Sequence, residues 1–153
     1  LIYKIKDNVE LNDIPKESSM LGKANLIKEG SDITIVAYSN MVNVAKEAIA
    51  ADELQNCSIE LIDLQTVSPI DYDTIKNSLK KTKRLLVCQE APSNSSVGTT
   101  VISKIVESEL FHELEVAPKL VSGLHSPMPS AKHLELNVIP QAEDITNAVK
   151  SML

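Results

Sequence analysis

The sequence has few aromatic residues and no excess of basic charge. Aromatic residues make up 3% of the 153 residues, and tryptophan is absent. Such a chain lacks the side chains on which single-stranded nucleic acids stack their bases. Its formal net charge is -6 at pH 7, whereas nucleic acids and anionic membranes both bind basic surfaces. The composition therefore argues against nucleic acid and membrane as partners.

Long apolar runs and paired cysteine motifs are also missing. No apolar run approaches the roughly 18 residues that a membrane-spanning helix needs. The two cysteines, Cys57 and Cys88, lie far apart and form no C-x-x-C motif. We interpret them as reduced packing residues of a protein from a cytosolic type of compartment. The length suits one domain, which buries about two thirds of the surface of its unfolded chain.

The usual catalytic and nucleotide-binding motifs are absent as well. No serine lies in a G-x-S-x-G elbow. His112-Glu113 does not extend to H-E-x-x-H, and Gly22-Lys23 lacks the first glycine and the hydroxyl residue of a phosphate-binding loop. The first turn from a strand to a helix, Tyr38–Met41, contains no glycine, which disfavours close approach of a pyrophosphate. From the residues alone, no catalytic site is indicated.

A strand, helix and strand between residues 31 and 71 organise the chain. Residues 33–37 form a short apolar β-branched run, which is typical of a strand covered on both faces. Apolar residues then recur at helical spacing over 41–49, and residues 58–64 form a second strand of the same kind. The helical connection makes the two strands parallel, and a crossover of this kind is almost always right-handed.

The same patterns predict three more strands and three more helices. Asp71 is expected to cap one of these helices, and Pro140 is expected in the first turn of the last. The first strand, with Ala24 and Leu26 facing inward, is expected to run antiparallel to its neighbour if the two pair, because a four-residue connection cannot hold a crossover. The further strands are 23–28, 84–89 and 118–124, and the further helices are 71–83, 97–114 and 140–152. We therefore expect an α/β fold with an open, mostly parallel sheet and helices on both faces.

In such sheets a crevice lies at the carboxyl ends of the strands. The loops at this edge are 38–40, 64–68, 89–96 and 124–130. We interpret Glu90 as a partly buried hydrogen-bond anchor of its loop, and His125 as a surface or loop-stabilising residue rather than a catalytic one. The lysines at positions 80, 81 and 83 are interpreted as a solvated helix end, where the helix dipole favours cations.

Several segments in order resemble one known family. The chain is similar, from about Leu21 onward, to the C-terminal domain of the β subunits of thiamine-diphosphate-dependent 2-oxo acid dehydrogenases. These are the E1 components of the pyruvate, branched-chain 2-oxo acid and acetoin dehydrogenase complexes. The segments that carry the resemblance are Leu21–Ala24, Glu29–Tyr38, Met41-Val42, Ile62–Asp71, Glu90–Pro92, Gly123–Pro129, Ile139-Pro140 and Glu143–Ile145.

The resemblance implies a transketolase C-terminal domain fold: three α/β/α layers with a five-stranded mixed sheet in which one strand is antiparallel. Residues 1–20 resemble the connector from a pyrimidine-binding domain that this sequence lacks, so we expect a fragment with the domain at 21–153. The complete E1 enzyme decarboxylates a 2-oxo acid, with pyruvate favoured, on thiamine diphosphate and transfers the acyl group to the lipoyl group of E2. In the family, the groups that activate the cofactor and hold its diphosphate and magnesium lie outside this domain.

The resemblance therefore implies no catalytic, cofactor-binding or metal-binding residue in this chain, which is expected to be inactive alone. It implies subunit association and E2 docking, with three partners: the E1 α subunit, a second E1 β subunit and the subunit-binding domain of the E2 acyltransferase. The implied location is the cytoplasm, or the mitochondrial or plastid matrix in a eukaryote. The candidate interface or loop residues are Gln65, Gln89, Glu90, Pro92, His125, Pro127 and Leu153.

The chain departs from the family pattern at several loops. The family usually has Arg, His and Asp at the positions of Gln65, Gln89 and His125, and it has glycines near Ser39 and Ser95. Two alternatives remain open at this point. One is the C-terminal domain of a transketolase or of a 1-deoxyxylulose 5-phosphate synthase, which share the fold. The other is a free-standing α/β interaction module.

Overall fold

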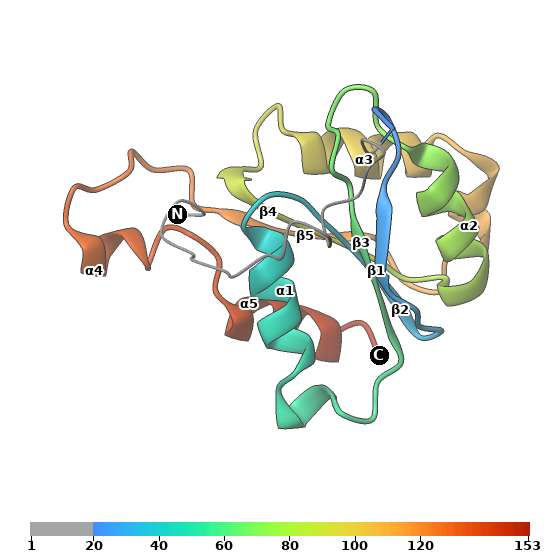
Figure 1. The fold of residues 1–153 in the computed structure, drawn as a ribbon, viewed down its shortest axis with the longest axis horizontal. Coiled ribbons are helices and arrows are strands. Elements are labelled where there is room, and N and C mark those ends of the chain that lie inside the picture. The colour runs from blue at the N-terminus through green and yellow to red at the C-terminus, as the bar shows by residue number, and fades with distance from the viewer. Residues whose placement is uncertain (1–19) are drawn as a thin grey trace, which may run out of the picture.

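A five-stranded mixed sheet lies between two layers of helices (Figure 1). The computed structural model describes residues 20–153. The strands, in the spatial order β1-β3-β2-β4-β5, are β1 (Asn25–Lys28), β2 (Ile33–Ala37), β3 (Ile59–Asp63), β4 (Leu85–Pro92) and β5 (Lys119–Gly123). The helices are α1 (Met41–Ile49), α2 (Tyr72–Thr82), α3 (Val97–Val106), α4 (Lys132–Glu135) and α5 (Ala142–Lys150), with short 3-10 turns η3 (Asp52–Leu54) and η4 (Glu109–Glu113). The predicted three-layer α/β/α fold is confirmed.

Strand β1 is the antiparallel member of the sheet. It pairs with β3, with Asn25 opposite Asp63, while β2, β3, β4 and β5 run parallel to one another. The sequence predicts the antiparallel direction if β1 and β2 pair, but in the structure they do not pair. The reason is that β2 already has β3 on one edge and β4 on the other, so β1 pairs with the outer edge of β3 instead.

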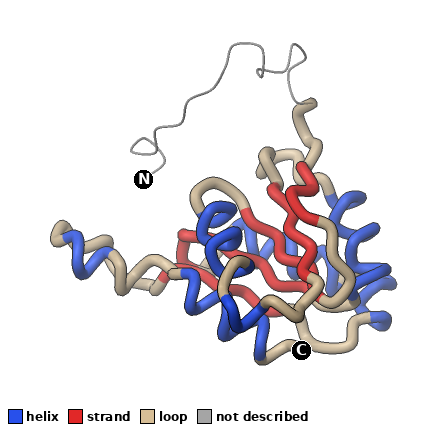
Figure 2. Tube along the Cα trace, turned by 60° about the horizontal axis from the view of Figure 1, so that its bottom comes forward, coloured by secondary structure: helices blue, strands red, loops and turns tan. Residues whose placement is uncertain are grey.

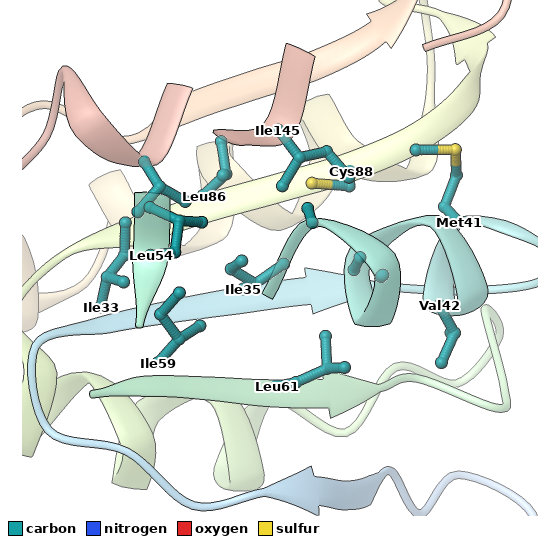
Figure 3. Packing of buried hydrophobic residues seen from close by; sticks show 14 of the residues in the cluster. Ile33, Ile35, Met41, Val42, Leu54, Ile59, Leu61, Leu86, Cys88 and Ile145 are labelled. Carbon is teal, nitrogen blue, oxygen red and sulfur yellow. The ribbon is translucent and has the colours of Figure 1, made fainter. Parts of the chain in front are cut away.

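The two faces of the sheet build two separate cores. Alternate residues of β2 enter opposite cores: Ile35 lies in the cluster under α1 and α5, and Val36 lies in the cluster under α2 and α3. Figure 3 shows the first cluster, to which β3 contributes Leu61 and α5 contributes Ile145. Every residue of β2 is buried, which explains why its sequence is apolar without alternation.

Two boundaries differ from the predicted ones. Strand β4 runs to Pro92, three residues past the predicted end at Gln89, because the main chain of Pro92 pairs with Gly123 of β5. The helix predicted to end near Leu114 ends at Val106, and the chain continues as the 3-10 turn η4. Ser108 adopts an extended conformation, and its hydroxyl donates to the carbonyl of Ile105 at 2.7 Å, which closes the helix end.

Three further features of the structure differ from the sequence prediction. Leu26 was expected inward but is 42% exposed, because the register of the edge strand β1 shifts between Leu26 and Lys28. The loop predicted after β5 contains the short helix α4. Pro140 precedes the closing helix instead of lying in its first turn, since Gln141 is the N-cap. The prediction that residues 1–20 form a connector lies, apart from Met20, outside the described residues.

Candidate functional site

Four loops meet at the carboxyl edge of the sheet, as predicted. The four parallel strands all end at this edge, and their register places Ala37 beside both Asp63 and Cys88. The backbone amide of Leu64, in the loop after β3, donates to the carbonyl of Ala37 at 3.0 Å. The loops that follow β2, β3 and β4 are therefore neighbours in space.

Gln89 holds the end of β4 to the start of α3. Its side chain is fully buried. The amide oxygen accepts a hydrogen bond from the backbone N–H of Gly98 at 2.7 Å, and the amide nitrogen donates to the carbonyls of Ala91 and Pro92 at 2.9 and 3.0 Å. The anchoring role that the sequence predicted for Glu90 is therefore carried by Gln89. A glutamine directly after four buried apolar residues is the sequence signal that would have indicated it.

Glu90 lies at the same edge, half-buried, near the end of β2. Burial, and to a lesser extent the negative charge of Glu90, raises the pKa of Tyr38. The two side chains thus face the same part of the edge from neighbouring strands. Tyr38 does not supply a nucleophile, because a phenol with a raised pKa stays neutral at pH 7.

Backbone strain is concentrated at this edge. Ser39, Gln65 and Ser95 adopt the left-handed conformation, with φ of 56°, 50° and 48°. This region costs a residue with a side chain roughly 1–2 kcal/mol relative to the right-handed one. The family glycines near Ser39 and Ser95 are therefore expected at positions where a glycine removes strain. Gln65 is exposed, and its backbone N–H donates to the Asp63 carboxylate at 3.0 Å.

The start of the described chain is fastened to the same edge by Asp71. Its carboxylate caps α2 as predicted, accepting from the Thr74 N–H at 3.2 Å, and also accepts from the Ala24 N–H at 3.1 Å. Burial alone would raise the pKa of Asp71, but these hydrogen bonds outweigh burial and lower the pKa. The Gly22 N–H adds a bond to the Thr66 hydroxyl at 3.2 Å. The incoming chain and the loop between β3 and α2 therefore form one unit.

This edge does not suit a diphosphate or its magnesium ion. The N-terminus of α3 is occupied by the Ser96 capping box and by Gln89, and that of α2 by the negative charge of Asp71. Within residues 20–153, no three His, Cys, Asp or Glu side chains gather as a metal site would require. The thiol of Cys88 is fully buried, and burial raises its pKa, so it is unreactive.

The chain between β5 and α5 leaves the body of the domain (Figure 2). Residues 124–139, here called the arm, project beyond the end of the sheet with α4 near the tip, and the view in Figure 1 agrees. His125 and Pro127 both lie on the arm and are exposed. The structure thus separates the predicted site residues: Gln65, Gln89, Glu90 and Pro92 lie at the carboxyl edge, and His125 and Pro127 lie on the arm.

Leu153 lies away from both groups. It is half-exposed, and the chain end beside it is held near the start of β5, where the Lys119 ammonium donates to the Ser151 hydroxyl at 2.7 Å. The start of β5 belongs to the amino edge of the parallel strands. The seventh predicted residue is therefore at the opposite edge of the sheet.

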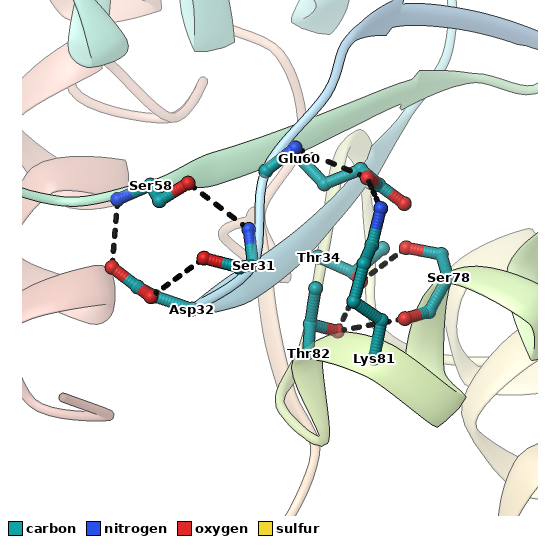
Figure 4. A network of polar contacts seen from close by, with 9 residues as sticks. Ser31, Asp32, Thr34, Ser58, Glu60, Ser78, Lys81 and Thr82 are labelled. Atoms are coloured by element: carbon teal, nitrogen blue, oxygen red, sulfur yellow. Dashed lines mark hydrogen bonds and ion pairs between the residues drawn. The ribbon is translucent and has the colours of Figure 1, made fainter.

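The amino edge carries a buried polar network instead of loops (Figure 4). Glu60 is 2% exposed and pairs with Lys81, and its carboxylate also accepts from the Gly30 N–H at 3.1 Å. The Thr34 hydroxyl bonds to those of Ser78 and Thr82. The three lysines predicted to be solvated, at positions 80, 81 and 83, are all exposed, and Lys81 also pairs with Glu60 in this network. This network joins α2 to β2 and β3.

Comparisons with known proteins agree with the fold. The family model described as "Transketolase, C-terminal domain" matches residues 22–145. The pyruvate dehydrogenase E1 component subunit beta of Rickettsia bellii is 40% identical over 150 residues, covering 98% of this chain and 44% of that protein. The mitochondrial pyruvate dehydrogenase E1 component subunit beta of Pisum sativum is 38% identical over 130 residues, covering 85% of this chain and 36% of the relative.

Solved structures match in the same way. A chain of a split-gene transketolase, described as an inactive beta4 tetramer, superposes with a TM-score of 0.74 at 25% identity, covering 91% of this chain and 45% of that one. The present chain spans less than half the length of these curated relatives. Across the described residues, no helix combines the length and apolarity that crossing a membrane requires.

Proposed function

Because this chain belongs to the transketolase C-terminal domain family, we propose that it is that domain of a pyruvate dehydrogenase E1 β subunit. The observation that carries the proposal is the 40% identity, over 98% of the chain, to such a subunit. The complete enzyme would decarboxylate pyruvate with thiamine diphosphate and pass the acyl group to the lipoyl group of E2. It would work in a bacterial cytoplasm or in an organelle matrix.

Within that enzyme, this domain would serve assembly. Thiamine diphosphate and magnesium would be held by other parts of the E1 enzyme. In this domain Gln89 and Ser96 already engage N–H groups at the start of α3, and Asp71 engages those at the start of α2. Residues 1–20 would connect the domain at 21–153 to a pyrimidine-binding domain. Asp71 supports this role, because it fixes the incoming chain to the edge where the loops meet.

The proposed partners are the E1 α subunit, a second E1 β subunit and the subunit-binding domain of E2. Self-association is supported by the related split-gene transketolase chain, which is described as a beta4 tetramer. Gln65, Glu90 and Pro92 would contact neighbouring subunits at the carboxyl edge. Leu153, half-exposed at the opposite edge, would contact the E2 domain.

The test is reconstitution of the enzyme from a full-length β chain that contains these residues, co-expressed with the α subunit of the same organism. With thiamine diphosphate and magnesium, we expect decarboxylation of pyruvate coupled to reduction of an artificial electron acceptor. Branched-chain 2-oxo acids are the comparison substrates, and the 153-residue chain alone is the inactive control. An assembled α–β complex that decarboxylates none of these acids would refute the proposal. Ketol transfer between sugar phosphates would assign the chain to a transketolase instead.

A further inference from the structure

Serine follows asparagine twice in the sequence, at Asn77-Ser78 and at Asn94-Ser95, and glycine never follows it. A small residue after asparagine leaves room for its own backbone nitrogen to attack the side-chain amide, and such an intramolecular attack is fast when the two groups can meet. Both asparagines are exposed. The two sites therefore differ in backbone conformation rather than in access to water or in the residue that follows.

The first site is held by a helix. Asn77 lies inside α2, where each backbone N–H donates to the carbonyl four residues earlier, so the N–H of Ser78 is engaged. Ser78 is also 4% exposed, and its hydroxyl bonds to that of Thr34 at 2.6 Å. Attack at Asn77 therefore requires that α2 opens locally first.

The second site lies in the turn between β4 and α3. Among residues 20–153, no backbone carbonyl accepts a hydrogen bond from the Ser95 N–H. The Ser93 hydroxyl donates to the Asn94 Oδ1 at 3.5 Å, and this is the oxygen on which negative charge develops when the amide carbon is attacked. We propose that Asn94 is a site of spontaneous deamidation, at which the Ser95 backbone nitrogen attacks the side-chain amide.

The reaction needs only water. The Ser95 nitrogen loses its proton to water and forms a bond to the Asn94 side-chain carbon. The bond from that carbon to the amide nitrogen breaks, and the nitrogen leaves as ammonia. Water then opens the resulting five-membered imide at one of its two carbonyls, which gives either aspartate or isoaspartate. No group is oxidised or reduced.

The product changes the carboxyl edge in two ways. A negative charge appears beside the start of α3, whose first turn holds no acidic residue, and a helix N-terminus stabilises such a charge. Isoaspartate also adds one atom to the main chain between Pro92, which pairs with Gly123, and Ser96, which caps α3. The chain alone undergoes this change, whatever enzyme it belongs to.

The experiment incubates the folded 153-residue chain at neutral pH and follows both sites by mass spectrometry of proteolytic peptides. We expect Asn94 to be converted at least about 10-fold faster than Asn77, because Asn77 reacts only when its helix turn is open. Chromatography should resolve aspartate and isoaspartate, since the imide opens both ways. Asn94→Gln is the matched control, which keeps the amide but cannot form the five-membered ring, and circular dichroism checks that it is folded.

The chain unfolded in urea supplies the reference, because both asparagines are then free to react and should be converted at comparable rates. Equal conversion of Asn94 and Asn77 in the folded chain would overturn the proposal. So would a folded chain in which Asn94 persists while the unfolded chain is converted, since the turn would then protect it. Aspartate without isoaspartate would show direct hydrolysis instead of attack by the Ser95 nitrogen.

Discussion

The two edges of one sheet are built differently. At the amino edge, Glu60, Thr34 and Asp32 each find partners on neighbouring elements, so the polar groups there serve the domain itself. At the carboxyl edge, Ser39 and Ser95 hold strained conformations. The arm leaves that edge with its apolar side chains uncovered. The polar groups of the amino edge therefore contribute hydrogen bonds within the domain. The carboxyl edge, by contrast, holds strained serines and leads into a segment whose apolar side chains are exposed.

The largest expected effect tests how tightly the amino edge is packed. Gly30 lies against the backbone of β3, where an added Cβ would be 2.2 Å from the Ile59 carbonyl carbon. Because backbone atoms cannot move aside cheaply, Gly30→Ala should lower the free energy of unfolding by about 3 kcal/mol. Urea unfolding followed by circular dichroism measures it, with the exposed neighbour Glu29→Ala as the control. Equal stability of the two variants would mean that this edge is less tightly packed than its contacts indicate.

The next effect tests Gln89, a buried anchor of the carboxyl edge. Gln89→Leu would leave the Gly98 N–H without its acceptor and remove the donor to two carbonyls. Losing a buried hydrogen-bond partner costs about 2 kcal/mol. We expect that loss in urea unfolding, with faster hydrogen exchange at Gly98. The control is Gln65→Leu, at an exposed position, and a similar loss in both variants would show that Gln89 has no special role.

The third effect is pH-dependent and belongs to the amino edge. Burial would raise the pKa of Glu60, but hydrogen bonds from Lys81, Ser78 and the Gly30 amide, together with the charge of Lys81, lower it below the ordinary 4.5. The stabilisation is therefore complete above pH 4.5 and is lost as pH falls through the lower native pKa. Glu60→Gln should cost about 1 kcal/mol at pH 7, because Lys81 is half-exposed.

Unfolding at pH 7 and at pH 3 measures this difference, which should shrink as the pH falls towards the native pKa of Glu60. Glu107→Gln is the control, since the Lys104–Glu107 pair is exposed on both sides. A Glu60→Gln variant that is as destabilised at pH 3 as at pH 7 would show that packing, rather than charge, accounts for the loss.

The smallest expected effect is a gain in stability, and it tests the strained serines of the carboxyl edge. Ser39→Gly and Ser95→Gly should each stabilise the domain by about 0.5 kcal/mol, because relief of left-handed strain exceeds the entropy that glycine adds to the unfolded chain. Ser103→Gly, in the interior of α3, is the control and should destabilise. Thermal unfolding distinguishes these signs. If all three glycines destabilise, the carboxyl edge carries no strain at these serines.

The sequence predicted the parts of the fold that burial dictates. The apolar runs at 33–37 and 58–64 became β2 and β3 within one residue at each end. The Asp71 cap was also predictable, because a carboxylate before a helix satisfies N–H groups that the helix leaves open. These signals are local, and each is contained in a few consecutive residues.

What the sequence did not reveal depends on distant partners. Strand β4 continues through a polar stretch because Pro92 meets Gly123, and that pairing has no local signature. The same holds for Gln89, whose acceptor role depends on Gly98, nine residues further along. Residues 124–130 were predicted as a loop because of their prolines, and the short helix α4 that follows them was not predicted. The family itself was recognised from residues, and the comparisons confirm it.

The antiparallel direction of β1 determines at which edge of the sheet the chain enters the domain. Because β1 runs against β3, Asn25 lies beside Asp63, and the chain arrives where the parallel strands finish. Had β1 run the other way, the connection would enter among Glu60, Lys81 and Thr34, and any pull on it would act on the network that keeps the domain folded. The antiparallel strand thus brings the incoming chain to Asp71 and Thr66, which hold it, and away from the pair of Glu60 and Lys81.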